Sequence, residues 1–345
     1  MRLVLPAGAV AKHRAPRRFT RPAALVFVAA LAIGGLRPLS AQVPATVAAD
    51  FRVDPAPNEP FRFVAYGDMR FTATSETDAS HPNARQALVA RVTADAPAAI
   101  FLNGDTVWHG GVLNDYAVMQ AETQVWRDAH LPVFPALGNH EFSECAEKQC
   151  LANWTNAYPQ VGGRRWYSVD VGSRLRAIAL DTDTALEDGS PQRAWLAAEL
   201  DHLPPTVDFV FIYLHHPLVA DLQGGFSASH NPRSNELALA AYLKGFAARS
   251  HARLIVCSGH IHNYERHTQD GILYLVSGGG GAHPVPVARD EGDAFQNPLF
   301  PNFHYLRFTV DGQSLRGEMY RLEDYGSASP HTYALRDSFE IRVGG

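Results

Sequence analysis

The chain alternates short apolar runs with amphipathic helical patterns over most of its 345 residues. The apolar runs are typical of buried β-strands and lie at 61–66, 98–103, 133–137, 175–180, 207–214, 253–257 and 272–276. Helical patterns lie at 83–95, 114–129, 191–201 and 234–249. This alternation favours an α/β fold in which helices cover the sheets.

The C-terminal pattern is different. The segments 304–311, 314–322 and 337–342 are strand-like and have no helical pattern between them. We expect an antiparallel hairpin at a sheet edge, followed by a closing strand.

The first 41 residues have the composition of a secretory signal peptide. Their cations are Arg2, Lys12, Arg14, Arg17, Arg18, Arg21 and Arg37, and they contain no acid. An apolar run from Ala23 to Leu36 then leads to the small residues Ser40 and Ala41, so cleavage is expected before Gln42. Because the run is shorter than the roughly 20 residues of a spanning helix, a retained anchor is the weaker alternative. We expect a periplasmic or secreted protein without stable membrane insertion after cleavage.

Charge restricts the partners of the mature chain. The net charge is −5, and it becomes −12 once the leader with its seven cations is removed. Such a surface repels nucleic acid and anionic membranes, so a small anionic substrate would be drawn only to a local cationic site. The segment 42–60 is rich in proline and lacks periodicity, which predicts an extended lead-in to a domain over 61–345.

Five short polar clusters stand at the ends of apolar runs. They are Gly67-Asp68-Met69-Arg70, Gly104-Asp105, Gly138-Asn139-His140-Glu141, His215-His216-Pro217 and Gly259-His260-Ile261-His262. Carboxylates, an amide oxygen and imidazoles form the ligand set of a binuclear centre for borderline divalent or trivalent ions. In this order the clusters resemble those of the calcineurin-like metallophosphoesterases, and the run from Gly259 to Arg266 is similar to that of the purple acid phosphatase branch.

The resemblance implies a four-layer αββα sandwich of two mixed β-sheets flanked by helices. It implies a hydrolase acting on phosphoric ester bonds, which cleaves phosphate monoesters by a metal-bound hydroxide at a centre of two ions, Fe, Zn or Mn. The alternatives are a phosphodiesterase or nucleotidase on the same centre, or a degenerate metal-binding module without catalysis. Since only 19 residues precede the domain in the mature chain, the resemblance points to a single-domain version.

The resemblance also assigns roles to individual residues. The metal ligands would be Asp68 and His262 for the first metal, Asn139, His215 and His260 for the second, and Asp105 as the bridge between them. His140 would contact the substrate phosphate and assist the leaving oxygen. Glu141 would orient His140.

One departure from the family pattern affects the first metal. Many members have His two residues after the first Asp, and purple acid phosphatases have Tyr three residues after the bridging Asp, whereas this chain has Arg70 and Trp108. Neither a guanidinium nor an indole can ligate a metal. Water or His109 could complete the shell, or the first site could be weak or lost. Arg70 could bind phosphate oxygens as a catalytic group, or form a salt bridge at a loop start.

Two features lie outside the clusters. His230, in the loop 224–234, could reach the substrate or could simply be solvated. Cys145 and Cys150 follow the third cluster, and in an oxidising compartment we expect them to form a disulfide, the alternative being two free thiols.

Overall fold

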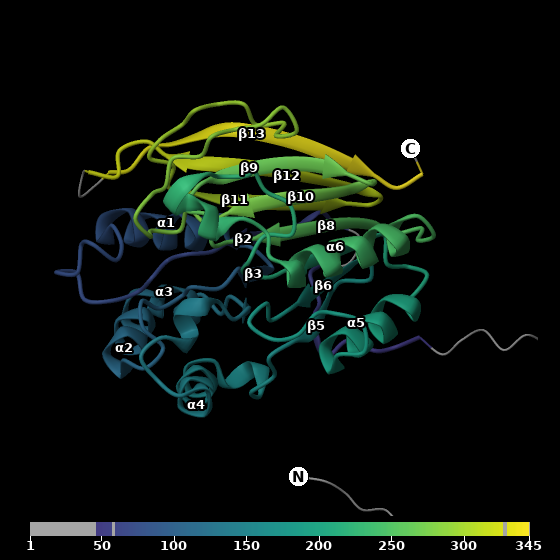
Figure 1. The fold of residues 1–345 in the computed structure, drawn as a ribbon, viewed down its shortest axis with the longest axis horizontal. Coiled ribbons are helices and arrows are strands. Elements are labelled where there is room, and N and C mark those ends of the chain that lie inside the picture. The colour runs from purple at the N-terminus through teal and green to yellow at the C-terminus, as the bar shows by residue number, and fades with distance from the viewer. Residues whose placement is uncertain (1–45, 57–58, 327–329, 345) are drawn as a thin grey trace, which may run out of the picture. The chain divides into compact units, whose positions relative to one another are not determined.

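The computed structural model describes residues 46–56, 59–326 and 330–344. The expected signal peptide over 1–41 lies outside the described residues. The described part contains two mixed β-sheets with flanking helices, which confirms the predicted fold class (Figure 1). Within these ranges, no helix combines the length and the apolar character that crossing a membrane would require.

The first sheet has seven strands, in the order β1-β5-β6-β7-β8-β10-β9. Its strands are β1 (Phe51–Val53), β5 (Tyr167–Val171), β6 (Leu175–Ala179), β7 (Phe209–Tyr213), β8 (Arg253–Ser258), β9 (Tyr264–Gln269) and β10 (Ile272–Ser277). The central strands β6, β7, β8 and β10 are parallel. Helices α5 (Pro191–Asp201) and α6 (Ser234–Ala247) connect β6 to β7 and β7 to β8, and both pack on the outer face of this sheet.

The second sheet has six strands, in the order β13-β12-β11-β2-β3-β4. Its strands are β2 (Phe61–Tyr66), β3 (Ala99–Leu102), β4 (Val133–Pro135), β11 (His304–Asp311), β12 (Ser314–Leu322) and β13 (Tyr333–Arg342). β2, β3 and β4 are parallel, and the C-terminal strands add an antiparallel hairpin and a closing edge strand, as predicted. Helix α1 (Pro82–Asp95) lies on the outer face, where Arg91 donates to the Tyr305 hydroxyl.

The inner faces of the two sheets meet in an aromatic core. Phe211 of the seven-stranded sheet lies 5.1 Å from Phe63 and 5.2 Å from Phe308 of the six-stranded sheet, between ring centroids. Phe63 and Phe308 also stack on each other at 4.6 Å. Buried aromatic side chains remove a large apolar area from water and lock neighbouring layers. This core holds the strand ends of the two sheets in a fixed relation to each other.

Several elements differ from those expected. The helix expected over 114–129 is divided into α2 (Leu113–Glu122) and α3 (Gln124–Asp128), because the Thr123 hydroxyl donates back to the Met119 carbonyl, an arrangement that bends helices. The lead-in 42–60 contains β1, which pairs in parallel with β5. Elements that the sequence patterns did not predict are β1, β5, β9, α4 (Glu147–Ala157) and the short 3-10 helices η1 (Asn139–Phe142), η2 (Pro159–Val161) and η3 (Gly225–His230).

Candidate metal centre

The predicted site residues emerge from the ends of strands in both sheets. Those after β2, β3 and β4 are Asp68, Asp105 and Asn139; those after β7 and β8 are His215, His260 and His262. Three of them have left-handed backbone conformations, with φ of 63° at Asp68, 50° at Asp105 and 69° at His260. Non-glycine residues rarely adopt this conformation, and it concentrates at functional sites. Here it marks the turns at which the side chains leave the strands.

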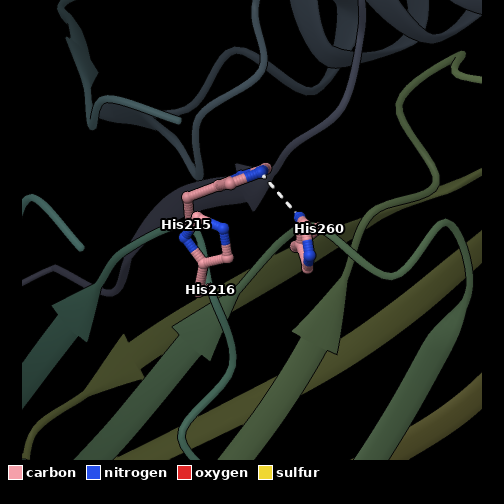
Figure 2. A group of neighbouring side chains, drawn as sticks. All are labelled: His215, His216 and His260. Atoms are coloured by element: carbon pink, nitrogen blue, oxygen red, sulfur yellow. Dashed lines mark hydrogen bonds between the residues drawn. The ribbon is translucent and has the colours of Figure 1, made fainter. Parts of the chain in front are cut away.

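The ligands expected for the second metal converge on His215. Its Nε2 atom lies 3.2 Å from Asp105 Oδ1, 3.1 Å from Asn139 Oδ1 and 3.3 Å from His260 Nδ1. Ligand atoms about 2.1 Å from a shared ion are about 3.0–3.4 Å from one another in octahedral or tetrahedral geometry. Figure 2 shows the His215 and His260 rings turned toward each other. The donor set therefore fits a metal ion.

The ligands expected for the first metal also lie together. His262 Nε2 is 3.4 Å from Asp68 Oδ1. Both atoms are buried, and neither has a hydrogen-bond partner among the described residues. An unpaired buried polar atom is costly, and a cation between the two would satisfy both. Carboxylate oxygens of Asp68 and Asp105 and a His215 nitrogen lie within 4.8 Å of one another, so the two ligand groups are adjacent.

The carboxylates make the centre attractive to positive charge. Burial disfavours the charged form of His215 and lowers its pKa. The attraction of the Asp105 and Asp68 carboxylates is stronger than this effect and raises the His215 pKa to about 10. The pKa of the neighbouring His216 is shifted in the opposite direction. Burial and the proximity of His215 lower the His216 pKa to about 2, and its Nδ1 atom lies 2.8 Å from the Thr182 hydroxyl. His216 is thus a neutral neighbour, and its ring centroid lies 4.3 Å from that of His260.

Backbone carbonyls orient three of the imidazoles. The Nδ1 atoms of His215, His262 and His140 lie 2.9, 2.6 and 2.6 Å from the carbonyl oxygens of Asn103, His283 and Trp108 respectively. A hydrogen bond at Nδ1 fixes the ring and leaves Nε2 to face the centre. Sequence reasoning missed these groups, because a carbonyl belongs to every residue type and carries no signature.

Arg70 contacts the oxygen of Asp105 that is not the one nearest His215. Its Nη2 atom donates to Asp105 Oδ2 at 3.1 Å, and its guanidinium carbon lies 5.0 Å from the centre of the Trp108 ring. The salt bridge considered for Arg70 is therefore formed, and its role toward phosphate oxygens stays a prediction. His109 turns elsewhere, with its ring nitrogens 3.9 Å from Asp115 and 3.6 Å from Glu144.

His140 is held beside the centre between Trp108 and Asp105. Its ring stacks on Trp108 with centroids 4.6 Å apart, and its Nε2 atom lies 3.8 Å from Asp105 Oδ2. The expectation that Glu141 orients this ring is wrong. The buried Glu141 carboxylate instead accepts from the backbone N–H groups of Asp105, Thr106 and Gly138 at 3.0, 2.7 and 2.7 Å. Glu141 therefore joins the loop of the second cluster to the loop of the third.

A small cavity opens beside Asn139. Its volume is about 250 Å³, and it is lined by Asn139, Phe142, Glu147, Arg165 and Asp183. Partial desolvation raises the pKa of Asp183 to about 6. On another side, the His230 ring lies 5.0 Å from that of His260, so this histidine, the last residue of η3, is brought to the centre.

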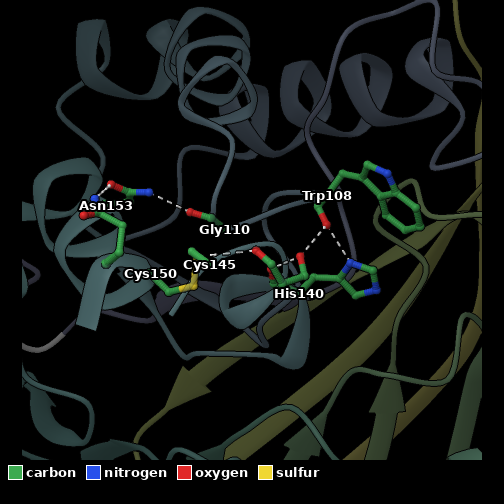
Figure 3. Close-up of a disulfide and its surroundings, with 8 residues drawn as sticks. Trp108, Gly110, His140, Cys145, Cys150 and Asn153 are labelled. Atoms are coloured by element: carbon green, nitrogen blue, oxygen red, sulfur yellow. Dashed lines mark hydrogen bonds between the residues drawn. A yellow bond between two sulfur atoms is a disulfide. The ribbon is translucent and has the colours of Figure 1, made fainter. Parts of the chain in front are cut away.

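A disulfide between Cys145 and Cys150 secures the segment after His140 (Figure 3). The free Cys257 is buried. Helix α4 carries Cys150 and Asn153, and the Asn153 side chain donates to the Gly110 carbonyl at 2.9 Å. The N–H of Gly110 in turn donates to the His140 carbonyl at 2.9 Å. The expected disulfide is therefore present and belongs to the support of the His140 loop.

Comparison with known proteins identifies the family of this chain. A family model described as calcineurin-like phosphoesterase matches residues 61–264, more than half of the chain. Purple acid phosphatase 1 of Ipomoea batatas is 25% identical over 228 residues, which cover 61% of this chain and 44% of that protein.

Two solved structures share the fold. A purple acid phosphatase from yellow lupin (Lupinus luteus) has a TM-score of 0.63 and 18% identity, and the match covers 84% of this chain and 55% of that one. GAP50 of Plasmodium, an anchor in the inner membrane complex, has a TM-score of 0.56 and 15% identity, with 83% and 90% covered. The chain thus spans about half the length of the purple acid phosphatases it matches. On the extent of the family match, the chain belongs to the calcineurin-like phosphoesterase family.

Proposed function

We propose that this protein is an exported hydrolase that cleaves phosphate monoesters at a centre of two metal ions. The observation that carries the proposal is the convergence of Asp105, Asn139 and His260 on Nε2 of His215, at spacings that suit a shared ion. The ligand assignment is that expected from the sequence. Asp68 and His262 would hold the first ion, Asn139, His215 and His260 the second, and Asp105 would bridge them.

Metal ions bound there would neutralise the phosphoryl oxygens and lower the pKa of a water molecule enough for it to attack phosphorus. The chain itself supplies position and a proton. The Trp108 carbonyl and indole hold the His140 ring so that Nε2 faces the centre. In the imidazolium form, His140 could donate this proton to the departing alcohol oxygen. The cavity beside Asn139 would accept part of a small substrate.

A second candidate is a module that binds metal and serves recognition rather than catalysis. The salt bridge from Arg70 to Asp105 favours it, because the guanidinium takes an oxygen that a bridging carboxylate needs for the first ion. The Plasmodium anchor protein is a relative in fold, so the fold is compatible with such a role.

The experiment combines elemental analysis with two assays. The purified chain is analysed for bound metals, then assayed on a chromogenic phosphomonoester and on the matching diester. At least two bound ions with monoester turnover support the proposal, and preference for the diester would support the phosphodiesterase alternative. One ion with no turnover on either ester would favour the recognition module. Asp105→Asn should lose both metal and activity, whereas Asp188→Asn, at an exposed position, should lose neither.

Export is tested separately. Mass spectrometry of material from the exterior or periplasm of the native host should give a chain that begins at Gln42. A full-length mass, or recovery only from the cytoplasm, would contradict export and leave the hydrolase proposal unaffected.

A further inference from the structure

A second group of acidic side chains lies behind the last histidine cluster. We call it the Asp221 cluster, and it consists of Asp221, Glu265, His267, Asp290 and Asp293. Three segments supply it: the loop after β7, the strand β9, and the long loop between β10 and β11. It shares no residue with the candidate metal centre.

The Asp221 cluster buries more negative charge than its cations balance. Asp221, Glu265 and Asp293 are 0%, 0% and 1% exposed. The nearby Arg289 forms its short contact with Asp293, and its Nη1 atom is 3.9 Å from Asp221 Oδ2. His267 approaches Glu265 at 3.2 Å and Asp221 at 3.8 Å. Three buried carboxylates, together with the exposed Asp290, thus face one guanidinium and one imidazole, and uncompensated buried charge is expensive.

Two carboxylates each accept a hydrogen bond from the described residues at one oxygen and none at the other. Asp221 Oδ1 accepts from the Asp290 N–H at 3.1 Å, and Glu265 Oε2 accepts from the Asp221 N–H at 2.7 Å. Asp221 Oδ2 and Glu265 Oε1 are buried and have no hydrogen-bond partner among the described residues. A carboxylate anchored at one oxygen presents the other in a fixed direction, as metal-binding carboxylates do.

The spacing suits a cation. Ligand atoms of Asp221, His267 and Asp290 all lie within 4.8 Å of one another. Oxygens on opposite sides of an ion with bonds of about 2.3–2.6 Å are about 4.6–5.2 Å apart, and neighbouring ones are closer. A set of carboxylates with at most one imidazole suits Ca²⁺ or Mn²⁺ better than ions that prefer sulfur.

We propose that the Asp221 cluster binds a further divalent cation, held by Asp221, His267 and Asp290, with Glu265 beside it. The cation would tie the three segments together. The long loop contains His283 and Val285, which contact His262 and Asn263 through hydrogen bonds. The site would therefore stabilise the support of His262, while taking no part in hydrolysis.

Burial, reinforced by Glu265, raises the pKa of Asp221 to about 7, which shows how strongly the site resists a bare negative charge. Protons could relieve that charge in place of a metal. The two explanations differ in whether added cations change stability.

The test uses the full chain stripped of metal with EDTA and dialysed. Thermal unfolding is followed in 1 mM CaCl₂, in 1 mM MnCl₂ and without added metal. The double variant D221N/E265Q is isosteric and removes two charges, and E291Q serves as the control because Glu291 is exposed in the same long loop. When the free metal concentration is about 100 times the dissociation constant, the Tm of the wild type and of E291Q should rise by about 5 °C or more.

The double variant should differ from the wild type in opposite directions without metal and with metal. Without added metal its Tm should equal or exceed that of the wild type, because two unbalanced charges are gone. Its Tm in CaCl₂ should rise less than that of the wild type, and with saturating MnCl₂ it should bind one ion fewer by elemental analysis. Equal metal content and equal Tm responses in the wild type and the double variant would overturn the proposal in favour of protons.

Crystals soaked in MnCl₂ decide the matter even if the double variant does not fold. An anomalous peak between Asp221, His267 and Asp290 supports the site. Peaks confined to the loops of Asp68, Asp105 and His215 overturn it.

Discussion

The Arg70 guanidinium lies 3.1 Å from Oδ2 of Asp105, while Oδ1 of the same carboxylate lies 3.2 Å from Nε2 of His215. The two oxygens of the expected bridging ligand thus face two different cationic or metal-binding groups. Arg70 is mostly buried, with 13% of its side chain exposed, so the salt bridge is poorly screened by water. A first metal would have to compete with this guanidinium for Oδ2.

We therefore expect the first metal to bind more weakly than the second. Calorimetric titration of Mn²⁺ into metal-free protein should give two separated steps at the centre. Arg70→His removes the competing charge and restores the residue type that many family members have there, so the weaker step should tighten by tenfold or more. Arg316→His, at an exposed position, is the control. Two equally tight steps in the unmodified protein would show that Arg70 moves away without cost.

His140→Ala should separate catalysis from metal binding. The His140 side chain stacks on Trp108 and is not among the ligands expected to hold a metal. Metal content should therefore remain, while turnover of a phosphomonoester falls about 10²–10⁴-fold, as is usual when an acid–base group is lost. His130→Ala, an exposed histidine, should change neither quantity. Loss of metal from the His140 variant would assign this residue a ligand role instead.

Glu141→Gln should destabilise the fold. The buried carboxylate accepts N–H donors from both neighbouring loops, and an amide would turn its NH₂ group toward one of them. One donor would lose its acceptor, at a cost of about 1–3 kcal/mol in the free energy of unfolding. Urea unfolding measures this, with Glu144→Gln as a control, because the Glu144 side chain is 61% exposed. Equal stability of the two variants would mean that the loops adjust freely around residue 141.

The stability of the metal-free chain should fall as pH rises from about 4 to about 7 at the Asp221 cluster. The folded-state pKa of Asp221 is about 7, against its ordinary value of 3.8, because burial and then Glu265 disfavour the charged form. Below pH 4 both folded and unfolded chains hold the proton, so Asp221 adds no pH dependence. Between the two values only the folded chain holds it, and stability declines until the folded pKa is passed.

The groups that face Asp221 across the cluster are Glu265, His267, Arg289, Asp290 and Asp293. To isolate Asp221, unfolding by urea in EDTA is compared at pH 5 and pH 8 for the wild type and Asp221→Asn. The wild type should lose more stability between these values than the variant does. A parallel change in both would assign the dependence to the neighbouring groups.

Much of the fold followed from periodicity in the sequence. The strands over 61–66, 304–311 and 314–322 and the helix over 191–201 have the predicted bounds, because each is bordered by turn residues and buries a continuous apolar face. β5 and β1 were missed for a physical reason. β5 mixes polar with apolar residues, and the three-residue β1 acquires its structure only by pairing with β5.

The candidate site shows the same division. Asp68, Asp105 and Asn139 could be recognised because each follows an apolar run at a loop. The actual role of Glu141 could not, because it depends on which N–H groups the folded loops present to it. Nor could the sequence show that Arg70 would pair with Asp105, 35 residues away. Such contacts are set by the tertiary arrangement rather than by local pattern.

The candidate ligands are divided between the two sheets. Asp68, Asp105 and Asn139 follow strands of the six-stranded sheet, whereas His215, His260 and His262 follow strands of the seven-stranded sheet. Either sheet alone would offer only half of a coordination sphere. An ion bound at the centre would therefore link the two sheets through ligands from both. Its release would be coupled to the separation of the sheets during unfolding. The absorption spectrum of a bound Co²⁺ ion would then show when the two sheets associate during folding.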